Sequence, residues 1–127
     1  MPVVEVAAGV IIRGDTVLVC QRNATGSHPF KWEFPGGKRE STESLAACLR
    51  RELREELAIE ATVGAEIWRT RHYYQPDRAV DLFFFLLTRF DGEPSNRVFA
   101  DIQWIARSTL AGLDFLEADR GLVGFLA

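Results

Sequence analysis

Apolar residues recur at helical spacing in the middle of the chain. Leu45, Leu49, Leu53 and Leu57 follow one another every four residues. At roughly 100° per residue they form a slowly drifting stripe, which predicts an amphipathic helix with a buried face. The polar run at residues 41–44, Ser-Thr-Glu-Ser, offers an N-cap and an acidic first turn just before the stripe. We therefore expect a helix that begins at this run and carries the four leucines.

Most other apolar segments follow strand patterns. Residues 3–12 are rich in β-branched side chains, a turn at Arg13-Gly14-Asp15 reverses the chain, and residues 16–21 return as a second strand. The next segment contains Asn, Gly, Ser and Pro and is expected to be a loop. Further strands are predicted at 32–34, 59–63, 67–75, 80–90 and 102–105, of which 80–90 should be buried on both faces.

Two shorter helical segments complete the pattern. Ser108 can cap a helical turn that runs through Leu113, and a last helix should begin near Ala118 or Asp119. Strands and helices alternate irregularly, without a repeat or a linker. The expected fold class is therefore α/β, with a mixed β-sheet sandwiched between α-helices (α/β/α), and residues 1–127 are expected to form a single domain.

Composition narrows the classes of function. The 127 residues carry a net charge of −3, with 47% hydrophobic and 26% charged residues, which is ordinary for a globular protein. They contain no block of Lys or Arg, which argues against binding a nucleic-acid polymer. Cys20 and Cys48 lack metal-ligand spacing and are expected to be buried thiols in a reducing compartment. No apolar segment is long enough to span a membrane, so we expect a cytoplasmic protein. Whether it is a monomer or a homodimer does not follow from the sequence.

Three carboxylates gather on the predicted helix. Glu52, Glu55 and Glu56 fall at i, i+3 and i+4, within about 100° of helix surface, and Glu56 borders the leucine face. Like charges this close repel one another, more strongly where they are partly desolvated. Arg51 and Arg54 could supply part of the compensating charge, and a divalent metal ion would supply more. The alternative is a solvated acidic face on which Arg51 and Glu55 form an ordinary i,i+4 pair.

The spacing of these residues resembles the Nudix box. That family's pattern runs Gly, five residues, Glu, seven residues, Arg-Glu-apolar, one residue, Glu-Glu, one residue, Gly-apolar. Here it falls on Gly37, Glu43, Arg51, Glu52, Leu53, Glu55, Glu56, Ala58 and Ile59. Ala58 departs from the pattern, because Gly is usual at this turn after the helix. Gly tolerates a left-handed backbone, so Ala58 is expected to cost about 1 kcal/mol of strain without removing a chemical group.

The resemblance implies a Nudix fold and metal-dependent chemistry. In the family, the box binds Mg²⁺ and the enzymes hydrolyse a nucleoside diphosphate linked to another group. By this resemblance, Mg²⁺, or Mn²⁺ in its place, would be bound by Glu52, Glu55, Glu56 and the carbonyl of Gly37. Arg51 would orient a glutamate, and one glutamate, with Glu52 favoured, would activate the attacking water. The expected catalytic residues are Glu52, Arg51 and Glu55.

Two further carboxylates are considered at the edge of the box. By the same resemblance, Glu43 would help to pin the loop before the helix. Several enzymes of the family also use a carboxylate from a loop ahead of a late strand. The aligned position here, six residues before Trp104, is Val98, and the nearest acidic residue is Asp101. This protein is expected either to use Asp101 after a loop shift or to do without the outer carboxylate.

Flanking segments resemble one branch of the family, the MutT-type nucleoside triphosphate pyrophosphohydrolases. The similarity lies in Arg22, in the Trp-Glu-Phe-Pro-Gly-Gly-Lys segment at 32–38 and in the Asp-Gly-Glu-Pro segment at 91–94. It implies hydrolysis of a nucleoside triphosphate to the monophosphate and pyrophosphate. Arg22 and Lys38 are then candidate phosphate ligands, although either could be a surface cation.

Three residues are candidates for contact with the nucleoside. Phe34 could stack on a nucleobase, for about 1–3 kcal/mol, or pack in the core. In MutT-like enzymes a polar residue ahead of the final helix hydrogen-bonds the base; Asp119 stands at this place, but Asp is also a preferred N-cap. Arg78, in the turn at 76–78, could reach the nucleotide or remain exposed. Of the two tyrosines at 73–74, only one can face the cleft.

The leading hypothesis is hydrolysis of an oxidised dNTP such as 8-oxo-dGTP, in sanitation of the nucleotide pool. A CTP- or dCTP-type pyrophosphohydrolase is the second. Hydrolysis of ADP-ribose or a diadenosine polyphosphate stays open, because the box specifies the diphosphate chemistry and not the leaving group. From other classes, the chain could be a Nudix-fold module that binds a nucleotide without hydrolysis, or an interaction domain with an incidental acidic helix. The complete set of Arg and Glu in the box argues against a pure binding module.

Overall fold

The computed structural model describes residues 3–127, and its main sheet is built around β1 (Val3–Arg13). β1 runs parallel to β7 (Arg78–Leu87), from the Val3–Ala79 pair to the Ile11–Leu87 pair. It also pairs antiparallel with β2 (Thr16–Gln21) near its end and with β4 (Gly36–Lys38) near its middle. Parallel and antiparallel pairs occur together, so the sheet is mixed, as predicted.

The other strands extend this sheet or form a small separate ribbon. The seven-stranded sheet has the order β3-β2-β1-β7-β6, with β4 paired to β1 and β9 paired to β2. β6 and β7 form a hairpin, and β5 pairs with β8 outside the main sheet. The bounds of these strands are Trp32–Glu33 for β3, Glu60–Thr62 for β5, Glu66–Gln75 for β6, Arg89–Asp91 for β8 and Asp101–Ala106 for β9.

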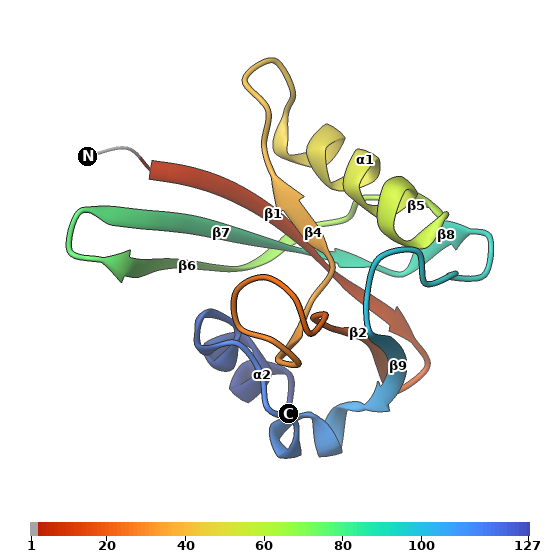
Figure 1. Ribbon diagram of the computed structural model, residues 1–127. Helices are drawn as coiled ribbons and strands as arrows, with labels where there is room; N and C mark the ends of the chain where they lie inside the picture. Colours follow the sequence, from red (N-terminus) through yellow and green to blue (C-terminus); the bar gives the residue numbers. More distant parts are fainter. Residues whose placement is uncertain (1–2) are drawn as a thin grey trace.

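Alternate side chains of β1 serve two cores, because successive residues of a strand point to opposite faces. Ala7 and Ile11 belong to the core under α1 (Leu45–Leu57), whereas Ala8 and Val10 belong to the core under α2 (Arg120–Leu126). Figure 1 shows α1 and α2 on opposite sides of the sheet. The predicted α/β/α arrangement is confirmed.

The leucine stripe of α1 is buried as its spacing predicts. Leu49, Leu53 and Leu57 are all 0% exposed, and each contributes roughly 1.5–3 kcal/mol relative to an exposed leucine. The helix begins after Ser44, whose Oγ accepts a hydrogen bond from the Ala47 N–H at 3.1 Å. The expected N-cap therefore lies at the end of the Ser-Thr-Glu-Ser run. Because the stripe fixes the rotation of α1, the positions of its glutamates are fixed as well.

The end of α1 has the backbone geometry that the Nudix pattern implies. Ala58 is the C-cap, with φ 58° and ψ 35°, and its N–H donates to the carbonyl of Arg54 at 3.1 Å. This is the left-handed region, in which a Cβ is crowded by its own backbone. The departure from Gly therefore falls on a position where Gly would be less strained.

Two local predictions are wrong. The strand predicted at 80–90 is interrupted at Thr88, so β7 ends at Leu87 and the chain continues as β8. Ser108 does not cap the following helical turn, because the 3₁₀ helix η1 (Arg107–Gly112) begins one residue earlier and has Ala106 at its N-cap position. β9 runs directly into this turn, which leaves no separate loop for a polar cap.

Two observations bear on the predictions from composition. Cys20 and Cys48 are buried free thiols, as expected. Across residues 3–127, none of the helices combines the length and the apolar character that a membrane crossing requires.

Candidate functional site

The site begins where β4 is pressed between β1 and α1. At Gly36, φ is +154°, and an added Cβ would collide with the backbone of Ala7 and Ala8 on β1. At Gly37, an added Cβ would overlap the carboxylate of Glu52 on α1. Only glycine can occupy both positions at this spacing, so the glycine pair places the backbone of β4 directly against a box glutamate.

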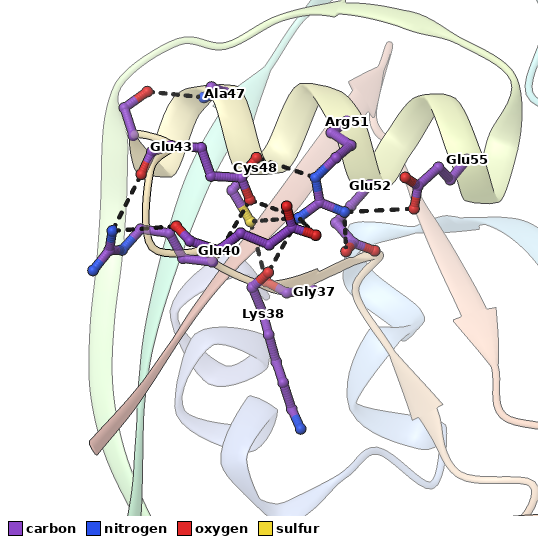
Figure 2. A network of polar contacts seen from close by, with 11 residues as sticks. Gly37, Lys38, Glu40, Glu43, Ala47, Cys48, Arg51, Glu52 and Glu55 are labelled. Carbon is purple, nitrogen blue, oxygen red and sulfur yellow. Dashed lines mark hydrogen bonds and ion pairs between the residues drawn. The ribbon is translucent and has the colours of Figure 1, made fainter. Parts of the chain in front are cut away.

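Arg51 is the centre of a polar network on this side of α1 (Figure 2). Its Nη2 and Nε donate to the two carboxylate oxygens of Glu43 at 2.6 and 3.1 Å, and its Nη1 donates to Glu52 Oε1 at 2.8 Å. A longer contact of 3.5 Å reaches Glu55, and Nη2 also donates to the Lys38 carbonyl at 3.2 Å. The guanidinium therefore ties the loop before the helix to two of the three box glutamates.

The loop side of this network is electrostatically satisfied. Hydrogen bonds from Arg51 and from the Glu40 N–H hold the pKa of Glu43 down at about 2. Glu43 is thus an ionised anchor for Arg51 at any physiological pH. Glu43 is thus placed as expected for a residue that pins the loop, and Arg51 as expected for a residue that orients a glutamate.

The helix side retains unbalanced negative charge. Burial raises the pKa of Glu56 to about 8, and the charges of Glu52 and Glu33 push it in the same direction, although the Gly36 N–H donates to Glu56 Oε1 at 3.1 Å. Burial also raises the pKa of Glu52, against the effect of Arg51. Two neighbouring carboxylates that resist ionisation together form a place where an added cation would be stabilising.

The donor set fits a hard divalent cation in its chemistry. Glu52, Glu55, Glu56 and the Gly37 carbonyl offer oxygen atoms, the ligands that Mg²⁺ and Mn²⁺ prefer. Cys48 lies beneath this loop, and its thiol donates to the Gly37 carbonyl at 3.5 Å. Within residues 3–127, however, no group of three acidic, His or Cys side chains already converges on one point as a metal cage. The residues are brought together on adjoining elements, and a cation would have to draw the carboxylates closer.

A second group of polar residues lies around β3. Arg22 follows β2, and its Nη1 donates to both oxygens of Glu33 at 3.2 and 3.3 Å. Its Nε and Nη2 donate to the carbonyl and hydroxyl of Ser27 at 3.0 and 3.1 Å. Burial raises the pKa of Glu33, and Arg22 opposes that rise. The predicted phosphate ligand is therefore held by its own loop and by a carboxylate of β3.

Asp119 is a buried acid at the far side of this group. It is 3% exposed, and its Oδ2 accepts from the Phe34 N–H at 3.4 Å. Burial raises its pKa to about 7, and the charge of Glu33 adds to the rise. Asp119 occupies the N-cap position of α2, yet in the described structure its side chain makes no capping hydrogen bond. The capping explanation for Asp119 is therefore wrong.

Phe34, Lys38 and Arg78 are not placed as a binding cluster. Phe34 is 4% exposed and its ring stacks on Phe115 with centroids 5.4 Å apart. The prediction of a stacking platform for a base is therefore wrong, and the alternative, packing in the core, is correct. Figure 2 shows the side chain of Lys38 extending away from the acidic face of α1. Arg78 is the first residue of β7, next to the β6–β7 turn. The part of β7 that lies level with Gly37 is at Phe83, five residues further along, because both Phe83 and Gly37 pair with Ala7.

The outer carboxylate is also absent from its aligned position. Val98 is 47% exposed, and its carbonyl accepts a hydrogen bond from the Asn23 side chain. Asp101 begins β9, in register with Gln21, and its Oδ2 accepts from Gln103 Nε2 at 2.9 Å. Its carboxylate is thus engaged on its own strand.

Sequence reasoning missed Glu33 and a hollow beside Asp119. Glu33 lies in the segment that resembles MutT-type enzymes, and its charge between Trp32 and Phe34 in a predicted strand was the signal that could have marked it. The hollow has a volume of about 200 Å³ and lies between the loop after β2, the end of β6 and η2 (Glu117–Asp119). Its lining residues are His28, Lys31, His72, Tyr74, Phe115, Leu116, Glu117 and Arg120.

Tyr74 lines this hollow. Burial raises the pKa of its hydroxyl, and the charge of Asp119 adds to the rise. A wider hollow of about 700 Å³ lies elsewhere, at the β1–β2 turn and β8, and contains none of the predicted site residues.

Comparison with known proteins supplies the last observations. The NUDIX domain model matches residues 3–123. A protein named putative 8-oxo-dGTP diphosphatase 2, from Mycobacterium tuberculosis (strain ATCC 25618 / H37Rv), is 36% identical over 122 residues, which cover 96% of this chain and 86% of that protein. The CTP pyrophosphohydrolase of Escherichia coli (strain K12) is 52% identical over 64 residues, which cover 50% of this chain and 47% of that protein. The solution structure of the E. coli ORF135 protein superposes with a TM-score of 0.89 at 33% identity, over 98% of this chain and 88% of that one.

Proposed function

This chain belongs to the Nudix family of hydrolases that act on pyrophosphate bonds, and from that premise we propose that it hydrolyses a nucleoside triphosphate to the monophosphate and pyrophosphate. One observation carries the proposal. The Arg51 network and the glycine pair of β4 hold the box glutamates against a single loop, and Glu56 and Glu52 resist ionisation there. A polyanionic substrate can approach such a face only with a cation, which is what metal-bound phosphate chemistry requires.

We infer that Mg²⁺, with Mn²⁺ as the alternative, is held by Glu52, Glu55, Glu56 and the Gly37 carbonyl. When bound, the ion would neutralise charge on the phosphate chain and lower the pKa of a water. The carboxylates are already adjacent on α1, and Arg51 would remain as the fixed partner of Glu52 and Glu43.

The chain's own residues would then accept the proton of the water and position the phosphate chain. Arg51 donates to Oε1 of Glu52, so Oε2 remains for the proton of the attacking water. The water oxygen would form a bond to the α- or the β-phosphorus, and the bond from that phosphorus to the bridging oxygen would break. Attack at the α-phosphorus expels pyrophosphate and attack at the β-phosphorus expels the monophosphate, so both routes give the same two products. Arg22 would contact the phosphate chain, because its guanidinium is held in place at the end of β2.

We infer that the base lies towards Asp119 and the hollow that Tyr74 lines. With a pKa of about 7, Asp119 would be present in both protonation states near neutral pH, so it could accept from a ring N–H or an amine and donate to a carbonyl. The relatives that match along most of this chain are named 8-oxo-dGTP diphosphatases. An oxidised purine triphosphate such as 8-oxo-dGTP is therefore our leading substrate, within the cytoplasmic nucleotide pool.

A cytidine-type triphosphate is the second candidate. An aspartate is the side chain that accepts from the exocyclic amine of cytosine. The 64 residues shared with the CTP pyrophosphohydrolase of E. coli are the most identical segment among the relatives named above.

A panel of substrates tests these proposals. The protein is incubated in Mg²⁺ or Mn²⁺ with 8-oxo-dGTP, dGTP, dCTP, 5-methyl-dCTP, ADP-ribose and a diadenosine polyphosphate, and the products are identified. We expect 8-oxo-dGTP to have the highest kcat/KM, pyrophosphate to be the second product, and a chelator to abolish turnover. Turnover of no compound would contradict hydrolysis altogether, and release of phosphate in place of pyrophosphate would contradict the mechanism.

The Glu52→Gln variant tests the catalytic assignment. Removing its charge takes away the proton acceptor and a metal ligand, so kcat should fall by at least about 10³-fold. Glu60→Gln is a matched control, because Glu60 is exposed and pairs with Arg54 outside the site. Near-normal kcat in Glu52→Gln, with the fold intact by circular dichroism, would move the base to another residue.

A further inference from the structure

The Arg22 guanidinium is fixed from two directions. Ser27, in the loop after β2, accepts from Nε and Nη2, and Glu33, on β3, accepts from Nη1 with both carboxylate oxygens. The two partners lie on different segments of the chain, so the plane and the direction of the guanidinium are both set. A long, flexible side chain held this way has already given up most of its rotamer freedom.

Glu33 is itself held rigidly. β3 pairs with β2, with Cys20 opposite Glu33. The next residue, Phe34, is buried in the core and donates its N–H to Asp119. The carboxylate of Glu33 therefore extends from a fixed backbone position beside Arg22, and β3 determines where this acceptor lies.

The same ion-pair geometry recurs elsewhere without this support. Arg13 Nη1 donates to both oxygens of Glu93 at 2.8 and 3.2 Å, but the two side chains are 49% and 69% exposed. In the Arg22–Glu33 pair the corresponding values are 31% and 20%. An exposed pair contributes little, because water screens it and both side chains keep their freedom. The partly buried pair at Arg22 is the one that can hold a side chain in a single arrangement.

We propose that Glu33 is a positioning residue, which fixes the Arg22 guanidinium beforehand for the phosphate chain of the nucleotide. The inference rests on the proposed function, because it takes the nucleotide phosphates as the ligand of Arg22. Ser27 and Glu33 leave part of the fork of five N–H groups unused, and this part is available to phosphate oxygens without further ordering of the side chain. If Glu33 instead competed with phosphate for Arg22, removing its charge would tighten nucleotide binding and would not weaken it.

A charge-removing variant tests the proposal. Binding of a non-hydrolysable α,β-methylene triphosphate analogue is measured by calorimetry for wild type and Glu33→Gln, beside KM and kcat with the substrate itself. We expect Kd and KM to rise about five- to tenfold, the range for losing the preordering of one long side chain, with kcat within about threefold. Glu93→Gln is the matched control and should change neither constant.

The pathway of the effect is tested in the Arg22→Ala background. If Glu33 acts through Arg22, Glu33→Gln should weaken binding no further once the arginine is absent. Ser27→Ala, which removes only the hydroxyl contact in an exposed loop, should raise Kd about twofold and gives a second measurement independent of β3.

Two results would overturn the inference: an unchanged or tighter Kd in Glu33→Gln, or an equal weakening in the Arg22→Ala background. A purely structural role would lower the melting temperature without this dependence on Arg22. Absence of turnover by the wild-type protein would contradict the proposed function alone, because analogue binding measures the positioning effect without turnover.

Discussion

The two ends of the candidate site both contain an acid that resists ionisation, half-buried at one end and buried at the other, yet they are built in different ways. At one end, Glu56 lies among other carboxylates of α1, and its pKa is raised to about 8. At the other, Asp119 is a single carboxylate at the start of α2, held by the Phe34 N–H, with a pKa raised to about 7. Glu33, on a strand, raises the pKa of both acids, but only Glu56 also has like charges on its own helix, from Glu52 and Glu55.

This difference indicates two roles for a carboxylic acid that is partly or fully removed from water. Carboxylates crowded on one helix repel one another until a cation joins them, so their arrangement suits a metal ion. A solitary buried acid with one backbone partner can be neutral or charged near pH 7, so its arrangement suits hydrogen bonding to a ligand that offers donors and acceptors. Changes confined to one end should therefore alter one function and spare the other.

Among changes that keep every charge of the site, the largest effect is expected from Gly37→Ala at the metal end. The added Cβ would overlap the Glu52 carboxylate and displace it from β4. Misplacing a reacting group by about 1 Å can cost roughly 10²-fold in rate, so we expect kcat to fall by at least about 10²-fold. The ratio of kcat/KM between 8-oxo-dGTP and dCTP should stay unchanged, because Asp119 is untouched.

Gly124→Ala is the control for that substitution. Gly124 lies in α2 and an added Cβ there meets nothing within 4 Å. Alanine is the better helix former by about 1 kcal/mol, so this variant should unfold at higher urea concentration with unchanged kcat. Near-normal kcat in Gly37→Ala would show that Glu52 does not need its place against β4.

A smaller effect, on stability, is expected from Asp119→Asn at the base end. The folded-state pKa of about 7 lies above the unfolded value of about 3.9. The native state therefore binds more protons between these values, and the contribution of Asp119 to stability is present below about pH 4 and lost as pH rises through 7. Asparagine keeps an acceptor for the Phe34 N–H without a charge. The variant should equal wild type near pH 4 and exceed it by on the order of 4 kcal/mol at pH 8, since the two pKa values differ by about 3 units.

Urea unfolding at pH 4, 6 and 8 measures this difference. Substrate preference, measured in parallel, should shift away from that of wild type, while kcat on the preferred substrate stays within about tenfold. A stability difference that is constant across the pH range would show that Asp119 does not titrate in the folded state. A large loss of kcat on every substrate would place Asp119 at the metal end.

The contrast between the two ends also explains what the sequence could predict. Three glutamates at i, i+3 and i+4 are neighbours on any helix, so the acidic cluster and its leucine face follow from spacing alone. The contact between Asp119 and the Phe34 N–H joins residues that are 85 apart in the sequence. The Arg22–Glu33 pair depends on β3 returning beside β2. Such contacts come from strand pairing, which local patterns do not specify.

Phe34 is a further case in which the local sequence does not specify the contacts of a side chain. The segment Trp-Glu-Phe is extended, and alternation along it leaves two possible faces for each ring. The packing of Phe115 and Phe84 around Phe34 decides in favour of the core. Ser108 failed as a cap for a related reason, because the end of β9 sets where the following turn begins.

The smallest effect is expected from Ala58→Gly, which lies at the end of α1 and belongs to neither end of the site. Ala58 has φ 58° and ψ 35°, a left-handed conformation that costs a non-glycine residue roughly 1–2 kcal/mol. Glycine relieves that strain but loses more conformational freedom on folding, by about 0.5–1 kcal/mol, so the net gain should be about 0.5–1 kcal/mol. The Ala58 N–H can still donate to the Arg54 carbonyl, so α1 keeps its glutamates in place and kcat should stay within about twofold of wild type. Urea unfolding and steady-state kinetics measure both quantities. A changed kcat would mean that the helix end is coupled to the acidic cluster, and the departure from the family's glycine would then be a feature of the site and not a local strain.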